Sequence, residues 1–318
     1  MSDRVVHIGS AERWSVAREV RAVTDTAIAP EQVNKESLRG QRVMCWHPKY
    51  WRAIPEEYKR ECRAVVFFHH YVFDYFEDPT VAAALCMNRR MAKLLVRSQP
   101  HKPVRIVHVG GAEDAVPYAR RNRATSKILL LMVGNAAAPT CDEERRVVLR
   151  HTSRKGVELI LPIAERLDAS RYGWVFVGPN WDNYANTLEG RGWTVIHPGM
   201  MNWPAHFAAM GEGDVYLMLS RVEGGPLPLL ETMGLGIWPV ATPAGFAPEL
   251  LAGGGIGRLA PAFDGGNGDA VADAVAEHLL SLSKSDLSQA RERVRASVAP
   301  RTWPCFRTEV EAFLNDVF

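Results

Sequence analysis

Two carboxylates, Glu223 and Glu231, are separated by eight positions around a glycine-containing corner of the chain, Gly224-Gly225-Pro226-Leu227. Carboxylate oxygens accept hydrogen bonds from hydroxyl groups. The backbone N–H groups at the start of a helix carry a partial positive charge and suit a phosphate. The helix start therefore suits a phosphate group, and a corner of this kind with two carboxylates could serve several ligands.

The elements that must position these residues form a strand, loop, helix and strand. Residues 215–219 are continuously apolar, the helix after the loop ends at Gly234 and Gly236, and residues 237–241 are apolar again. Ligands of open α/β sheets bind at the carboxyl ends of the strands. The corner after residue 219 is such an end.

Two series of alternating strands and helices predict an α/β fold with parallel, doubly wound sheets. The predicted strands are 4–8, 42–46, 64–69 and 104–109 in the first series, and 128–133, 174–177, 194–197, 215–219 and 237–241 in the second. Residues 81–97 are expected to form one helix, and further helices are expected at 269–282, 285–298 and 308–317. The series predict one domain over 1–125, a second over 126–300, and a C-terminal helix in 301–318 that can pack back on the first.

Several function classes find no support in the chain. It contains no GxGxxG after the first strand, no GxxxxGK[ST] loop and no GxSxG elbow, which disfavours a dinucleotide enzyme, a P-loop NTPase and an α/β-hydrolase. The five cysteines are scattered and show no metal-ligand spacing, so we expect reduced thiols and no metal site. No apolar run is long enough for a membrane span and the chain begins with no secretory signal, so a cytoplasmic location is expected.

The net charge of +2 hides an asymmetry between the two halves. Residues 1–128 contain 22 basic and 14 acidic residues, whereas the remainder contains 16 and 22. A basic half suits an anionic partner such as a nucleic acid, a membrane surface or an acidic small molecule. Solvated surface helices explain the same charges equally well.

The segment that begins at Ser220, SRVEGGPLPLLETMGLGIWPVAT, resembles the donor-binding signature of retaining glycosyltransferases of the GT-B fold, family 4. The family pattern has a Ser-x-x-Glu-Gly loop, a Pro-Leu pair and a second Glu. Further resemblances are Arg154-Lys155-Gly156, the WVFVGP segment that ends at Pro179, and Ala247-Pro248-Glu249-Leu250. The resemblance covers roughly the last 190 residues and implies two Rossmann-like domains that face each other across a cleft.

The resemblance also implies roles for the site residues. Glu223 would accept hydrogen bonds from the donor sugar, Glu231 would bind the ribose hydroxyls, and Lys155 would neutralise the diphosphate. Gly224 and Gly225 would let the backbone approach the donor, and Pro226 and Leu227 would lead into the helix that faces the phosphate.

The sequence departs from the family pattern after the first strand of the second series. The family usually has an Arg after the glycine of that strand, but here Asn135 follows Gly134. Arg150 or Arg154 is the expected replacement cation.

In the first half, the resemblance implies a histidine against the donor sugar. His69 is the first candidate and His70 the second. Gly9 and Ser10 resemble a shortened acceptor loop.

The sequence thus predicts a metal-independent retaining glycosyltransferase that needs no cofactor and uses a nucleotide-diphosphate sugar, with UDP or GDP as the favoured nucleotide. Two alternatives remain open. One is a sugar-nucleotide-binding protein that has lost activity, and the other is a transferase that modifies a DNA base or another polyanion. The acceptor is unassigned, and an anionic acceptor such as a nucleic acid or a membrane-associated lipid would suit the basic half. A membrane-associated lipid acceptor would place the protein at the membrane periphery.

Overall fold

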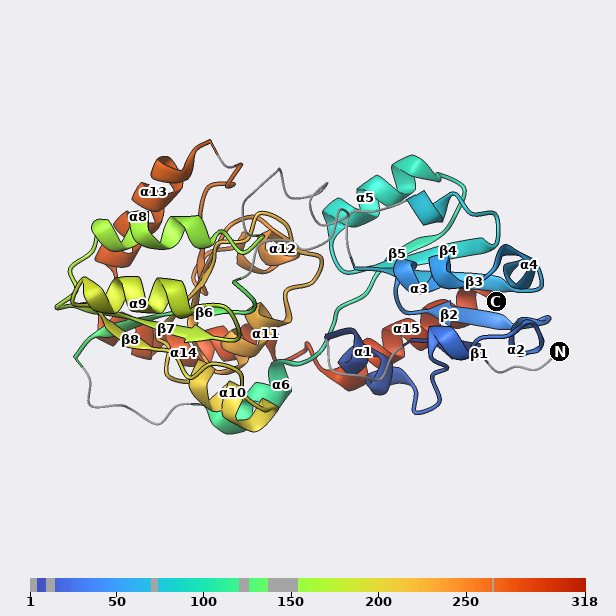
Figure 1. Ribbon diagram of the computed structural model, residues 1–318, viewed down its shortest axis with the longest axis horizontal. Helices are drawn as coiled ribbons and strands as arrows, with labels where there is room; N and C mark the ends of the chain where they lie inside the picture. Colours follow the sequence, from blue (N-terminus) through green and yellow to red (C-terminus); the bar gives the residue numbers. More distant parts are fainter. Residues whose placement is uncertain (1–4, 10–14, 70–73, 120–125, 137–153, 265) are drawn as a thin grey trace. The chain divides into compact units, whose positions relative to one another are not determined.

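The computed structural model describes the chain except residues 1–4, 10–14, 70–73, 120–125, 137–153 and 265. The chain folds into two compact units (Figure 1). The first contains residues 1–110 and 301–318, and the second contains residues 111–300. Residue 125, where the sequence places the domain boundary, lies outside the described residues.

The first unit is built on a five-stranded parallel sheet whose strand order follows the chain. The strands are β1 (Val5–Ile8), β2 (Arg42–Cys45), β3 (Arg63–Phe68), β4 (Val81–Cys86) and β5 (Val104–Ile106). Five of the six residues of β3 are buried, as expected for an apolar strand covered on both faces.

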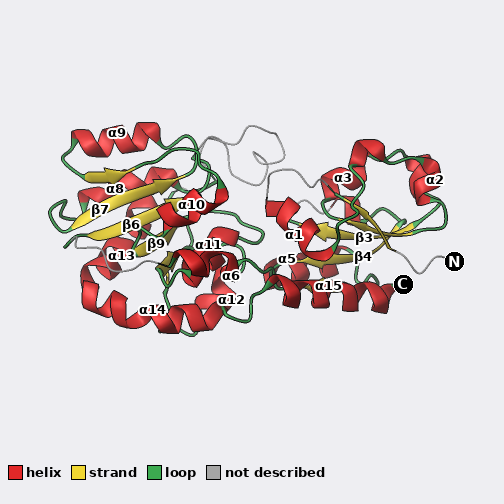
Figure 2. Ribbon diagram, turned by 90° about the horizontal axis from the view of Figure 1, so that it is seen from below, coloured by secondary structure: helices red, strands yellow, loops and turns green. Residues whose placement is uncertain are grey.

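Short helices connect these strands, and the C-terminal helix joins the same unit (Figure 2). The helices are α1 (Ser15–Val23), η1 (Pro30–Gln32), α2 (Lys35–Leu38), α3 (Pro48–Ala53), α4 (Glu56–Lys59), η2 (Asp74–Phe76), α5 (Arg89–Ser98) and α15 (Trp303–Val317). Helix α15 packs against α1. Two ion pairs tie it to the β5 segment, Arg105 to Asp316 at 2.9 Å and His108 to Glu309 at 2.9 Å.

The prediction of one helix over 81–97 was wrong. Residues 81–86 form β4, which pairs with both β3 and β5, and only Arg89–Ser98 is helical. The alanine-rich stretch favours a helix locally, but pairing and burial between two strands override that preference. Asn88 separates the two elements, because its side chain accepts a hydrogen bond from the backbone N–H of Met91 at 2.8 Å and thereby caps α5.

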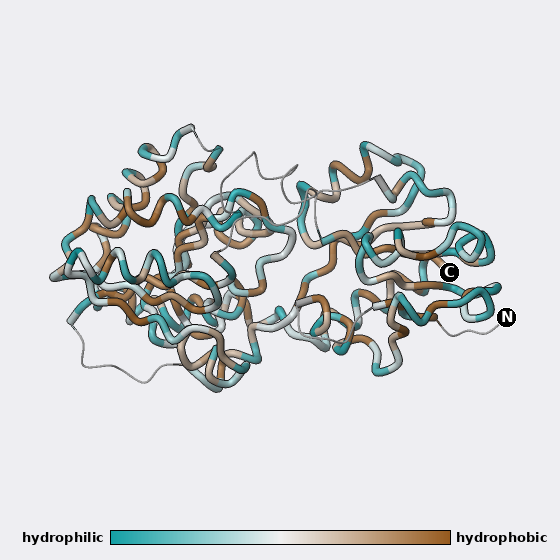
Figure 3. Tube along the Cα trace, in the orientation of Figure 1, coloured by the Kyte–Doolittle hydropathy of each residue, from teal (hydrophilic) through white to brown (hydrophobic). Residues whose placement is uncertain are grey.

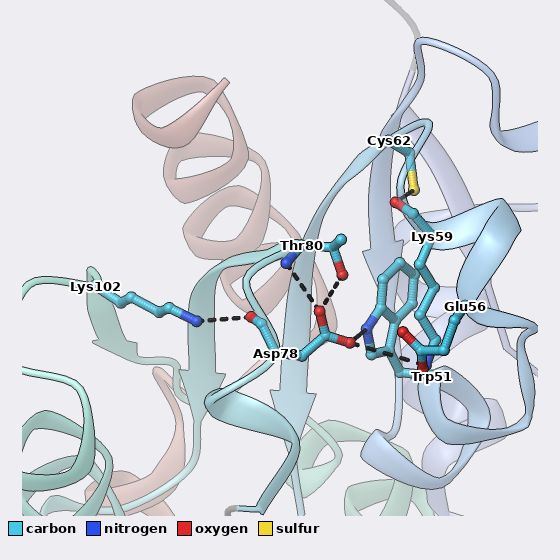
Figure 4. A network of polar contacts seen from close by, with 7 residues as sticks. All are labelled: Trp51, Glu56, Lys59, Cys62, Asp78, Thr80 and Lys102. Carbon is cyan, nitrogen blue, oxygen red and sulfur yellow. Dashed lines mark hydrogen bonds and ion pairs between the residues drawn. The ribbon is translucent and has the colours of Figure 1, made fainter.

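A polar network supports the amino ends of β3 and β4 (Figure 4). The Asp78 carboxylate accepts a hydrogen bond from the Trp51 indole at 3.1 Å and lies 3.8 Å from the ammonium of buried Lys59. Its other oxygen accepts from the backbone N–H and the hydroxyl of Thr80. Lys102 donates to the Asp78 carbonyl at 2.8 Å. Since a buried charge is costly unless paired, this network fixes the chain just before β4.

The second unit contains a six-stranded parallel sheet of order β11-β10-β9-β6-β7-β8. The strands are β6 (Ile128–Val133), β7 (Tyr172–Val177), β8 (Thr194–Ile196), β9 (Val215–Met218), β10 (Trp238–Ala241) and β11 (Arg258–Leu259). The strand order reverses beside β6, which pairs with both β7 and β9. Such a reversal places the carboxyl ends of β6 and β9 at the usual ligand position of a doubly wound sheet.

Helices flank this sheet (Figure 2), and its strands are made mostly of apolar residues (Figure 3). The helices are α6 (Ala112–Ala115), η3 (Val116–Tyr118), η4 (Val157–Leu159), α8 (Ile160–Glu165), α9 (Asp182–Gly190), α10 (Trp203–Met210), α11 (Leu227–Gly234), α12 (Ala247–Leu251), α13 (Gly268–Ser281) and α14 (Lys284–Val298). No helix in the described part of the chain combines the length and the apolar character needed to cross a bilayer.

Buried Asp214, just before β9, connects the amino ends of β6 and β9. It accepts a hydrogen bond from the backbone N–H of Leu129 at 2.9 Å and pairs with Lys284 at 2.9 Å and with Arg291 at 3.6 Å. These contacts join β6, the start of β9 and α14. Asp214 thereby joins the amino ends of the two neighbouring strands to α14.

Candidate functional site

The signature carboxylates lie around the corner between β9 and α11 in the second unit. Glu223 lies in the loop and is 6% exposed, and Glu231 lies within α11 and is 1% exposed. Helix α11 begins at Leu227, directly after Pro226. The next loop packs closely on this corner, since a Cβ on Gly245 would lie 2.6 Å from the Pro226 side chain. Gly224 is buried and Gly225 half-buried.

Lys155 and Glu223 form an ion pair that connects two loops. The Lys155 ammonium donates to Glu223 Oε1 at 2.7 Å, and the Ser220 hydroxyl donates to the same oxygen at 2.9 Å. Both charged side chains are largely buried, at 12% and 7% exposed. The structure thus brings together two of the residues that the sequence assigned to the donor.

The surroundings of Glu223 strongly favour its ionised form. Burial alone would raise its pKa. The charges of Lys155 and Arg154, with hydrogen bonds from Lys155 and Ser220, outweigh that effect and lower the pKa to about 2. Glu223 is therefore a fixed acceptor of hydrogen bonds at neutral pH.

The carboxyl end of β6 packs against Lys155, and the carboxyl end of β7 packs against that of β6. Gly134 follows β6, and a Cβ there would lie 2.9 Å from Lys155 Cε. The Gly134 carbonyl accepts a hydrogen bond from the indole of buried Trp181 at 2.8 Å. A Cβ on Gly178, after β7, would lie 2.3 Å from that same carbonyl oxygen. Both glycines are therefore needed for close packing beneath Lys155.

Gly156 holds the segment behind Lys155 in place. Its φ of +65° lies in the left-handed region, and a Cβ would approach the Leu219 carbonyl oxygen to 2.1 Å. The segment that carries Lys155 is thus pressed against the end of β9, which explains why the two loops of the ion pair meet.

The position after Gly134 is occupied by an amide pair. The Asn180 side chain donates to the Asn135 side chain at 2.7 Å, and Asn180 itself has a φ of +68°. Arg154 is close enough to lower the pKa of Glu223 through its charge. Arg150 lies outside the described residues, so of the two expected replacement cations Arg154 is the one that the structure places beside the site.

The charges of Glu223 and Glu231 both affect the pKa of one buried side chain, that of Tyr216. Burial raises the pKa of Tyr216 well above its usual value, and the negative charges of Glu223 and Glu231 raise it further. Tyr216 lies in β9, one of the two switch-point strands, and its raised pKa keeps the phenol protonated at neutral pH.

The candidates in the first unit have structural partners. His69 follows β3 and is buried, with Nε2 2.7 Å from the Trp46 carbonyl oxygen and 3.4 Å from Glu19 Oε2. A Cβ on Gly9 would lie 2.9 Å from the Val20 side chain, so close packing on α1 accounts for this glycine. Ser10 and His70 lie outside the described residues.

Sequence reasoning did not single out three residues that organise these sites. Trp181 follows a loop signal in the sequence but was given no role, and its indole donates to the Gly134 carbonyl. Ser220 could have been found from the Ser-x-x-Glu spacing of the family pattern. No sequence pattern indicated a role for Glu19. Burial raises the pKa of Glu19 well above its usual value, and the nearby charge of Arg18 only partly opposes this.

Within the described residues, no group of three or more His, Cys, Asp or Glu side chains is arranged to hold a metal ion. The charged groups beside Glu223 are instead the cations Lys155 and Arg154.

The two parallel-sheet units are the architecture of GT-B glycosyltransferases. The pneumococcal O-GlcNAc transferase GtfA in complex with UDP and GlcNAc aligns with a TM-score of 0.65 at 13% identity, over 88% of this chain and 57% of that chain. A trehalose-phosphate synthase (UDP-forming) from Burkholderia vietnamiensis aligns with a TM-score of 0.61 at 14% identity, over 86% and 71%.

Residues 140–295 match the model of the family of glycosyl transferases group 1. A putative colanic acid biosynthesis glycosyltransferase WcaL of Salmonella typhimurium is 31% identical over 179 residues. That alignment covers 49% of this chain and 42% of the relative, so this chain spans less than half the length of that relative.

Proposed function

We propose that the protein is a retaining glycosyltransferase that moves a sugar from a nucleotide-diphosphate donor to an acceptor without a bound metal. The observation that carries this proposal is the 2.7 Å pair of Lys155 and Glu223 at the switch point of the second sheet. A fixed carboxylate and a fixed cation side by side match a ligand that joins a polyhydroxylated sugar to a diphosphate.

In this proposal Glu223 accepts hydrogen bonds from sugar hydroxyls, for which its low pKa suits it. Lys155 separates from Glu223 enough to contact the diphosphate. Gly224 and Gly225 admit the donor close to the backbone, Pro226 and Leu227 lead into the helix start that faces the phosphate, and Glu231 takes the ribose hydroxyls.

Charge on the leaving diphosphate increases as the glycosidic bond breaks. Lys155 and Arg154 are cations held near that position before the reaction starts, so they stabilise the transition state more than the ground state. In a metal-independent enzyme these side chains provide the compensation that a divalent cation would otherwise supply. We propose a front-face mechanism, in which the acceptor attacks from the side on which the diphosphate leaves. Such a mechanism retains the anomeric configuration of the sugar without a covalent nucleophile.

UDP is the first nucleotide to test. A pneumococcal neighbour is described in complex with UDP and GlcNAc, and Anabaena Alr3699/HepE, aligned with a TM-score of 0.59 over 86% of this chain, in complex with UDP and glucose. GDP is the second candidate. The acceptor is proposed to bind to the first unit, where Gly9 and Ser10 are candidate contacts. His69 or His70 is the candidate contact of that unit with the donor sugar.

Two alternatives each have an observation in their favour. Asn135, paired with Asn180, stands where the family has an arginine, which favours a sugar-nucleotide-binding protein without activity. The excess of basic residues in 1–128 favours a polyanionic acceptor, such as a modified base of DNA or a membrane-associated lipid.

The proposal is tested by a thermal-shift screen of nucleotides and nucleotide sugars, followed by transfer assays with the best donor. A donor at 100 times its dissociation constant adds about 2.7 kcal/mol of stability. Transfer that persists in a chelator and gives a product with the donor's anomeric configuration supports the proposal. Binding without hydrolysis or transfer across an acceptor panel favours the inactive alternative. Nucleic-acid affinity that does not fall as salt rises counts against the polyanion alternative.

A further inference from the structure

Arg221 lies between Ser220 and Glu223 in the sequence and contacts two other segments of the second unit, the one around Lys155 and the one that carries Phe263. Its backbone N–H donates to the Arg154 carbonyl at 3.0 Å. Its guanidinium pairs with Glu158 of η4. The guanidinium carbon also lies 4.1 Å from the centre of the Phe263 ring, a stacked cation–π contact.

Stability alone is a poor explanation for this pair. The Arg221 side chain is 7% exposed and that of Glu158 is 29% exposed, and taking a charged side chain out of water gains little unless its polar atoms are bonded. Within the described residues, Arg221 Nε and Glu158 Oε2 are both buried without a hydrogen-bond partner. An apolar side chain of similar length would pack on Phe263 without that cost.

The contacts of Arg221 lie on both sides of Lys155 in the sequence. Lys155 stands between Arg154, whose carbonyl accepts from the backbone N–H of Arg221, and Glu158, whose carboxylate pairs with the Arg221 guanidinium. Glu223 follows Arg221 by two positions in the same loop. Movement of Arg221 would therefore change the spacing of the two loops that carry the ion pair.

We propose that Arg221 is a positioning residue that sets Lys155 against Glu223, and so fixes where the diphosphate of a donor binds. The role as a diphosphate positioner rests on the proposed function. The placement of Lys155 by Arg221 is a property of the free protein and is tested separately.

The first experiment measures Lys155 without any ligand. Wild-type protein is labelled with limiting acetic anhydride, and the acetylation of Lys155 relative to Lys127 is read by mass spectrometry. Arg221→Met keeps an unbranched apolar stem but removes the pairing with Glu158. We expect its Lys155 to react at least about threefold faster, equivalent to about 0.6 kcal/mol of lost restraint. Unchanged relative reactivity overturns the placement of Lys155 by Arg221.

Two further variants keep this experiment decisive. Glu158→Gln removes the charge of the pair with a smaller change in shape, and it should raise Lys155 reactivity even where Arg221→Met folds poorly. Arg191→Met removes an exposed pair with Glu165 in the same unit and should leave Lys155 reactivity unchanged.

The second experiment is a double-mutant cycle on UDP affinity, measured by calorimetry. Arg221→Met should weaken UDP binding by about tenfold in the wild-type background and have no further effect in Lys155→Met, because it acts through the lysine. An equal loss in both backgrounds overturns the positioning role. Wild-type protein that binds no UDP contradicts the proposed donor, and the labelling experiment still decides whether Arg221 places Lys155.

Discussion

The Lys155 ammonium lies 2.7 Å from Glu223 Oε1, although 68 positions separate the two residues in the chain. Lys155 lies in the connection between β6 and β7, and Glu223 lies in the loop after β9. The order of the second sheet reverses between β6 and β9. Each charge compensates the other in a largely buried setting, so removing one leaves the other uncompensated. This pair is the basis of the following predictions.

The pKa of Glu223 predicts a specific dependence of stability on pH. The folded state lowers this pKa from 4.5 to about 2, so the ionised carboxylate stabilises the fold above pH 4.5 and loses that contribution as the pH falls toward 2. A shift of this size corresponds to on the order of 3 kcal/mol. Urea unfolding of wild type and Glu223→Gln should therefore converge between pH 4.5 and 2. A free-energy difference that is constant over this range contradicts the assigned shift.

Lys155→Met should remove the cation that is proposed to bind the diphosphate of the donor. We expect a loss of about 10²- to 10³-fold in transfer rate, comparable to the removal of one preorganised transition-state contact. Lys284→Met is the matched control, because Lys284 pairs with buried Asp214, which keeps Arg291 and the Leu129 N–H as partners. The control should lose some stability and retain UDP affinity in calorimetry. Equal UDP affinities for the two variants would argue against Lys155 as a diphosphate ligand.

Gly156→Ala should affect both stability and the site. Its backbone is left-handed and the added Cβ would meet the Leu219 carbonyl oxygen at 2.1 Å, so the segment that carries Lys155 must move. Gly192 has a φ of +83° with nothing within 4 Å of an added Cβ. Gly192→Ala should thus show the cost of backbone conformation alone, about 1–2 kcal/mol in denaturant unfolding. Gly156→Ala should exceed that cost and also weaken UDP binding, and similar results for both variants would contradict the packing argument.

Asn135→Arg should strengthen diphosphate binding. Position 135 is exposed and follows the Gly134 turn, so an arginine there has room to add a cation beside Lys155. We expect a gain in UDP affinity of about three- to tenfold at low salt, as for an added charge-assisted hydrogen bond, which shrinks as the ionic strength rises. Asn135→Gln controls for loss of the amide pair with Asn180. A gain that is independent of salt would point to a cause other than charge.

The sequence predicted the second unit better than the first. The strands at the switch point are continuous apolar runs bounded by polar residues or glycine, so their positions followed from pattern alone, and the loop between β9 and α11 was recognisable from its spacing. In contrast, the stretch that forms β4 was assigned to a helix. Its alanines prefer a helix, and only pairing with β3 and β5 makes it a strand.

The site was predictable in its residues but not in its contacts. Resemblance assigned Glu223, Glu231 and Lys155 to a donor, and those roles stay predictions. The direct pairing of Lys155 with Glu223 depends on the tight approach of Gly156 to Leu219, which no local pattern encodes. The indole contact of Trp181 with the Gly134 carbonyl likewise joins segments 47 positions apart. Such contacts arise from the packing of strand ends and appear only in three dimensions.

The measurement that tests the central claim most directly is sugar transfer by Glu223→Ala, with the donor identified in the nucleotide-sugar screen and with the fold checked by circular dichroism. The account predicts that the variant folds, and that its transfer rate falls by about two orders of magnitude or more, because the carboxylate that holds the sugar is gone. A folded Glu223→Ala protein with full transfer activity would contradict the assignment of the Lys155–Glu223 pair to the donor site.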